Sequence, residues 1–133
     1  MDAPAEMGTH GDSESGLEAM VRLKADLHTH SADDARDVIG YSSESLIDAA
    51  AVCGVEVLAI AGHQEMVYSP RLANYAAGRG VLLLPAVERS IEGKHVLMLN
   101  PDRAQAAAST FEQLRALGRR DAAFVAPHPF YRL

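Results

Sequence analysis

Two histidines spaced two residues apart are the most distinctive chemical feature of this 133-residue sequence. His28 and His30 follow an alternating apolar run, and Asp26 precedes them in the same register. Because successive side chains of a β-strand point to opposite faces, these three residues would share one face. Two imidazoles on one face could hold zinc, iron, nickel or copper, and nearby carboxylates would add manganese. The alternative is an edge strand with two solvated histidines.

Further candidate ligands stand at the ends of other predicted strands. They are His63 after the run 55–60, Glu88 after 81–87, His95 at the start of 95–99, and His128 after 122–126. The carboxyl ends of parallel strands meet at one rim, so these side chains are expected to converge on the first two histidines. Singly, each is explained as well by a surface or core role. Together they favour a metal site.

Carboxylates could complete this site. Glu88 is suited to bridge two metals about 3.5–4 Å apart, because one carboxylate can give an oxygen to each. One of Asp33, Asp34 and Asp37 is expected to complete a third metal position or to orient a histidine, and the sequence leaves the choice open. Asp26 is expected to be buried and to bond a ligating imidazole.

Three cations are candidate contacts for a phosphate group at the same rim. They are Arg89, Lys94 and Arg132, and the simpler role for each is ordinary surface charge. Arg132 is the most interesting of them because it follows His128.

Composition bounds the function. Residues 1–20 hold five of the 18 acids and no Lys or Arg, which leaves 12 bases against 13 acids elsewhere. We therefore expect a disordered acidic tail at 1–20, one domain at 21–133, and no non-specific duplex binding. Cys53 is the only cysteine, so a disulfide framework is excluded and a small buried side chain is expected. No apolar run could span a membrane and no signal peptide is visible, so a cytoplasmic location is the default.

Helix signals separate the predicted strands. Ser42 begins one helix, which ends at Gly54, and Ser69-Pro70 begins the second. A third stretch begins at Asn100-Pro101 and restarts at a capping box over 109–112. The order strand, helix, strand, helix, strand, strand, helix, strand predicts an α/β fold with a largely parallel sheet.

Five segments resemble the ordered motifs of the PHP (polymerase and histidinol phosphatase) superfamily. They are Asp26-Leu27-His28-Thr29-His30-Ser31, Ala59-Ile60-Ala61-Gly62-His63, Leu84-Pro85-Ala86-Val87-Glu88, His95-Val96-Leu97 and Pro127-His128-Pro129. The resemblance spans about residues 22–131, and its first motif is the most specific.

The resemblance implies a distorted, TIM-barrel-like β/α barrel of seven strands, of which about five are present here. It implies two or three zinc, manganese or iron ions. By this resemblance, His28, His30 and Glu88 would hold one metal and form the catalytic centre. Glu88 and His128, assisted by His95, would hold a second metal. His63 with Asp34 or Asp37 would hold a third. The family has an acid where Gly62 stands and a late Asp-x-His motif that this sequence lacks. We therefore expect a domain incomplete at its C-terminus, completed by a missing segment or an oligomer partner.

The function implied is phosphoester hydrolysis by a metal-activated hydroxide. A histidinol phosphatase-like enzyme or a 5′–3′ exonuclease would act on phosphorylated metabolites, nucleotides or short nucleic acids. The alternatives are a catalytically impaired remnant that serves as a metal-binding or interaction module, and C–N hydrolysis as in related metal-barrel hydrolases.

Overall fold

The computed structural model describes residues 21–130. The predicted tail at 1–20 and the candidate phosphate contact Arg132 lie outside the described residues. The elements in chain order are β1 (Ala25–Thr29), α1 (Ser43–Val52), β2 (Val57–Ile60), β3 (Gly62–His63), α2 (Pro70–Ala77), β4 (Leu82–Leu84), β5 (Ala86–Ile91), β6 (Lys94–Leu99), α3 (Arg103–Ala107), α4 (Phe111–Leu117) and β7 (Ala123–Val125).

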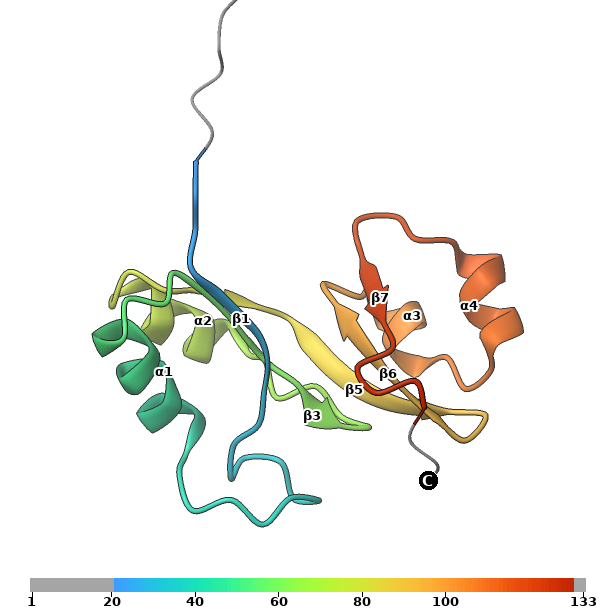
Figure 1. The fold of residues 1–133 in the computed structure, drawn as a ribbon, viewed down its shortest axis with the longest axis horizontal. Coiled ribbons are helices and arrows are strands. Elements are labelled where there is room, and N and C mark those ends of the chain that lie inside the picture. The colour runs from blue at the N-terminus through green and yellow to red at the C-terminus, as the bar shows by residue number, and fades with distance from the viewer. Residues whose placement is uncertain (1–20, 131–133) are drawn as a thin grey trace, which may run out of the picture.

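The strands form two sheets in a mixed α/β fold. The first has the order β1-β2-β4 and is wholly parallel, and the second has the order β3-β5-β6-β7. Within the second sheet, β3 and β5 are parallel, whereas β5, β6 and β7 are antiparallel. Helices α1 and α2 lie beside the first sheet, and α3 and α4 lie beside the second (Figure 1). The expected α/β class is observed, but the described strands do not close into a barrel, and the sheet is less parallel than expected.

The strand predicted at 81–87 is divided at Pro85. Proline has no backbone N–H for a sheet ladder, so pairing stops there. The part before it, β4, pairs with β2, and the part after it, β5, pairs with β3. Glu88 consequently lies inside β5 rather than beyond a strand end.

The sequence Ile91-Glu92-Gly93-Lys94 is typical of a tight turn, and it forms the turn of the β5–β6 hairpin. Its two central residues, Glu92 and Gly93, have φ angles of 48° and 76°. Positive φ at both positions suits the twist of a two-residue hairpin. The resulting register sets Ser90 opposite His95.

The helix starts of the first half are confirmed. The side chains of Ser42 and Ser69 accept from the amides of Ser45 and Leu72, and Pro70 occupies the first turn of α2. These caps satisfy backbone donors that have no partner within the helix.

The helix starts of the second half differ by a few residues. The capping box of α4 joins Thr110 and Gln113 rather than the predicted 109–112 pair, and α3 begins after Asp102 rather than at Asn100. Asn100 instead adopts a φ of 52° in the loop after β6.

Three apolar clusters hold the sheets to their helices. The first cluster packs α1 and α2 on the first sheet and includes Ile47, Leu58, Leu72 and Leu83. The second packs α3 and α4 on the second sheet and includes Val87, Ile91, Val96, Met98 and Leu114. The third joins the two sheets and consists of Ala59, Ala61, Ala86 and Leu97. Removing this apolar surface from water is the main driving force for the arrangement.

Two burial predictions were wrong. Asp26 is exposed, and its carboxylate lies 3.5 Å from the backbone amide of His28 rather than on an imidazole. Alternation predicts which side chains of a strand share a face, but not whether other elements cover that face. β1 is also an edge strand, so among the described residues it has a neighbouring strand along one edge alone. Cys53 is also exposed, because it caps the C-terminal end of α1. No helix among the described residues is long and apolar enough to cross a bilayer.

Replacing Asp102 by Ala is expected to lower the melting temperature at neutral pH and to have less effect in acid. The hydrogen bond from the Gln105 amide, together with the Arg120 guanidinium, holds the pKa of Asp102 below its usual range. Because the folded-state pKa is the lower one, the carboxylate stabilises the fold above its unfolded-state pKa, and this contribution is lost as the pH falls through the folded-state pKa. Thermal unfolding of both proteins at pH 7 and at about pH 3 checks this. An equal difference at both pH values would contradict it.

Candidate metal centre

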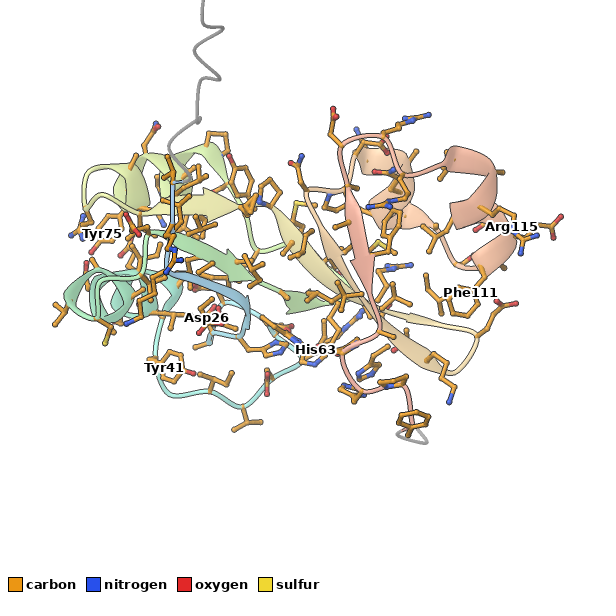
Figure 2. The ribbon with its side chains drawn as sticks, turned by 45° about the horizontal axis from the view of Figure 1, so that its top comes forward. Asp26, Tyr41, His63, Tyr75, Phe111 and Arg115 are labelled. Atoms are coloured by element: carbon orange, nitrogen blue, oxygen red, sulfur yellow. The ribbon has the colours of Figure 1, made fainter. Side chains whose placement is uncertain are left out.

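The candidate ligands named from the sequence converge where the two sheets meet. Figure 2 shows His63, at the end of β3, at this junction. His28 and His30 come from the end of β1, Glu88 from β5, His95 from β6, and His128 from the segment after β7. The expected gathering of these side chains is therefore observed.

One oxygen of Glu88 faces three imidazoles. Oε2 lies 3.1 Å from Nε2 of His28 and 3.5 Å from Nε2 of both His30 and His63. His63 and Glu88 are paired residues of neighbouring parallel strands, which explains their proximity. The Nε2 atoms of His28 and His30 are 3.2 Å apart, so all these nitrogens converge on one small volume.

The other oxygen of Glu88 faces two further imidazoles. Oε1 lies 2.8 Å from Nδ1 of His95 and 3.4 Å from Nε2 of His128, and these two nitrogens are 3.2 Å apart. His95 stands opposite Ser90 in the hairpin, and Glu88 is two residues before Ser90. Residues two apart share a face, so His95 and Glu88 point to the same side of the sheet. The carboxylate of Glu88, which is 3% exposed, thus lies between two sets of histidines.

A third group lies on the other side of His30 and His63. Asp37 Oδ2 is 3.8 Å from Nδ1 of both histidines, and Asp34 Oδ2 is 2.8 Å from Nδ1 of His63. The two imidazole rings stack, with centroids 4.6 Å apart. The structure therefore places both Asp34 and Asp37 beside the histidines.

Asp33 has a different role from its two neighbours. Its carboxylate accepts a hydrogen bond of 2.8 Å from the backbone amide of Ser43, at the start of α1. This bond satisfies one of the unpaired donors of the helix N-terminus. Of the three aspartates that the sequence left open, Asp33 is the one committed to the fold.

The protonation of the Asp34–His63 pair follows from its geometry. Burial raises the pKa of Asp34, but hydrogen bonds from the amides of His63 and Arg36 and from the His63 side chain outweigh it and lower the pKa. The ionised carboxylate can only accept, so Nδ1 of His63 must donate. In the neutral imidazole the lone pair is then on Nε2, which lies 3.5 Å from Glu88. Asp34 therefore orients His63, as partners of metal-binding histidines commonly do.

The charges around Glu88 also suit metal binding. Burial raises the pKa of Glu88, but the hydrogen bond with His28 and the nearby His28, His95 and His63 lower it overall, so the group is a carboxylate. Burial, followed by repulsion from His63, lowers the pKa of His30. Neutral imidazole and ionised carboxylate are the forms that bind metals.

One buried ring nitrogen fits a cation at this site. Nδ1 of His30 is buried and has no hydrogen-bond partner among the described residues, although it faces the Asp37 carboxylate. A buried polar atom without a partner is costly, and a bound metal would satisfy it. The described residues contain three groups of possible metal ligands, and within each group the ligand atoms lie within 4.8 Å of one another. The groups are His28, His30 and Glu88; Glu88, His95 and His128; and His30, Asp34, Asp37 and His63. Mixed nitrogen and oxygen donors of this kind fit divalent transition metals.

The candidate phosphate contacts are placed differently from the expectation. Arg89 donates to the carbonyls of Gln64 and Ala108, and as the neighbour of Glu88 in β5 it points to the opposite face. Lys94 donates to the carbonyl of Pro129. Sequence reasoning missed Arg36, which is exposed and donates to the carbonyl of His63. Its position between Asp34 and Asp37 was the available signal.

Replacing Gly62 by Ala is expected to destabilise the fold by about 1–3 kcal/mol, the usual cost of overpacking. A Cβ there would lie 2.3 Å from the Glu65 carbonyl oxygen and 2.8 Å from Val67 Cγ2. This close approach explains a glycine where the resembled family has an acid. Urea denaturation measures the effect, with Gly40→Ala as the control because nothing lies within 4 Å of that site. Equal stability of the two variants would refute the steric account.

Comparison with known proteins finds similarity to solved structures. Neither a family model nor a curated protein matches the sequence. A solved structure of an amidohydrolase from Chromobacterium violaceum, with bound sulfate and no metal, is similar, with 29% identity and a TM-score of 0.51. The match covers 61% of this chain and 29% of the amidohydrolase, so this chain matches less than a third of that protein's length. The likeness is to a hydrolase and does not single out the PHP superfamily.

Proposed function

We propose that this chain carries the centre of a metal-dependent phosphoester hydrolase. The observation that carries the proposal is the placement of Glu88, whose two oxygens face separate sets of histidines. A carboxylate in this position is the shared ligand of two-metal sites, which recur in phosphatases and nucleases.

Two sets of residues would hold the two metals. His28, His30 and Glu88 would hold one, and Glu88, His95 and His128 the other. When bound, such a pair supplies an activated water nucleophile at neutral pH and stabilises charge that develops on the reacting oxygens. Zinc, manganese and iron all suit these donors.

The chain's own residues prepare the centre for that chemistry. Asp34 holds the Nδ1 proton of His63 and so directs Nε2 toward Glu88. Arg36 is exposed and brings a positive charge beside the backbone carbonyl of His63, where it could meet an anionic substrate. With water as the nucleophile, no serine or cysteine is required.

A second candidate is hydrolysis of a C–N bond. The observation in its favour is the likeness to an amidohydrolase. Two-metal centres also serve aminopeptidases, so the geometry around Glu88 is compatible with either reaction. The substrate, rather than the ligand set, separates the two.

Hydrolysis assays on the full chain test the proposal. The protein is freed of metal, reloaded with Mn²⁺ or Zn²⁺, and given p-nitrophenyl phosphate, short oligonucleotides and a dihydropyrimidine. We expect metal-dependent phosphoester hydrolysis that the double variant His28→Ala/His30→Ala loses and the exposed control Glu112→Gln keeps. Hydrolysis of the dihydropyrimidine alone would favour the second candidate. Metal binding without any turnover would favour the non-catalytic alternative.

A further inference from the structure

Arg89 is a half-buried cation with an unusual set of contacts. Its guanidinium donates to the Gln64 carbonyl at 2.9 Å and to the Ala108 carbonyl at 3.3 Å. Its Nε is buried and unpartnered, and no carboxylate of the described residues forms an ion pair with it. Partial burial of a charge without a counter-charge is unfavourable, so the two carbonyl contacts are its main compensation.

The carbonyl that Arg89 holds belongs to a residue in an unfavourable conformation. Gln64 has a φ of 66°, in the left-handed region that residues other than glycine avoid. Its amide donates to the Glu88 carbonyl at 2.9 Å, while its own carbonyl accepts from Arg89. Two consecutive residues of β5 therefore hold Gln64 from both sides.

Gln64 directly follows His63, whose orientation depends on short contacts. The amide and Nδ1 of His63 reach the same Asp34 oxygen at 2.6 and 2.8 Å, and Nε2 lies 3.5 Å from Glu88. A change of backbone direction at Gln64 would move His63 relative to both carboxylates. We infer that Arg89 is a positioning residue, which holds Gln64 in its left-handed conformation and thereby fixes His63 in the candidate centre.

The test compares Arg89→Met with Arg115→Met, which alters an exposed arginine on the far side of α4 (Figure 2). The first readout is amide hydrogen exchange of His63 in the metal-free full chain. We expect exchange to become about tenfold faster in Arg89→Met, as for the loss of one charged hydrogen bond, and to be unchanged in Arg115→Met. This readout does not depend on the proposed function, since no metal or substrate is present.

The second readout rests on the proposed metal centre and is the affinity for Zn²⁺ alone. Loss of a residue that orients a ligand typically weakens metal binding about 10- to 100-fold, and we expect this for Arg89→Met. If no Zn²⁺ binds to the wild type, the proposed function fails while the exchange result still decides the role of Arg89.

Replacing Gln64 by glycine provides a rescue. Glycine adopts a positive φ without steric cost, so Gln64→Gly in the Arg89→Met background should restore most of the His63 protection. If Arg89 had a purely structural role, Arg89→Met would lower the melting temperature and Gln64→Gly would not restore the protection of His63. That result would overturn the inference, and so would unchanged amide exchange of His63 in Arg89→Met. If Arg89→Met does not fold, Arg89→Lys, which keeps the charge but loses the two-carbonyl contact, takes its place with the same expected outcomes.

Discussion

Replacing Glu88 by Gln is expected to abolish the proposed hydrolysis and to weaken binding at both proposed metal positions that share this residue. The amide has one oxygen, so it cannot serve both histidine sets as the carboxylate does. We expect the metal-dependent rate to fall by about 10³-fold or more, in line with the loss of electrostatic stabilisation at a reacting centre. Single-turnover hydrolysis by the metal-loaded proteins measures the effect.

Glu112→Gln is the matched control, because it makes the same chemical change on an exposed position of α4. This control should keep the wild-type rate. A Glu88→Gln protein that retains wild-type metal content and rate would show that Glu88 is a buried acid held by histidines for the fold alone.

Replacing His30 by Ala is expected to change the stability little without metal and to lower it clearly when metal is present. The substitution removes the buried Nδ1 that lacks a partner, and this relief, about 1–3 kcal/mol, offsets much of the packing that is lost. The metal-free melting temperature should therefore change little. With metal at about 100 times its dissociation constant, each occupied position stabilises the wild type by about 2.7 kcal/mol, and the variant should lose this gain at the positions that His30 lines.

His95→Ala is the matched comparison for His30→Ala. His30 belongs to two of the three ligand groups, whereas His95 belongs to one. Scanning calorimetry with and without Zn²⁺ should therefore show a smaller loss of metal stabilisation for His95→Ala. A large fall in the metal-free stability of His30→Ala, with its metal response intact, would contradict this account.

The parts of the fold that depend on local signals could be predicted from the sequence. Ser42 and Ser69 begin their helices as predicted because capping is decided within a few residues. The β5–β6 hairpin was predictable for the same reason. The division of one apolar run at Pro85 was not predicted. Proline inside a strand pattern signals a break, but the apolar residues on either side of it do not show that the two halves pair in different sheets.

The candidate site could be predicted as a set but not in its details. His28, His30 and His63 converge as the strand-end rule predicts, because parallel strands bring their carboxyl ends to one rim. Glu88 lies inside β5, and the β5–β6 hairpin brings His95 beside it. The roles of Asp33 and Asp34 depend on how the loop over 31–40 folds back on α1 and β3, which no local pattern specifies. The burial of Asp26 was wrongly predicted because alternation says nothing about which strands cover a face. Arg89 was assigned to phosphate before its side of β5 was known.

Metal content is the most direct test of the central claim that Glu88 is shared by two metal positions. Wild type, Glu88→Gln and Glu112→Gln are equilibrated with Zn²⁺, freed of excess by gel filtration, and analysed by elemental mass spectrometry. We predict about two metal ions per chain for the wild type and for Glu112→Gln, and fewer than one for Glu88→Gln. Equal metal content in all three proteins, or none in the wild type, would contradict the claim.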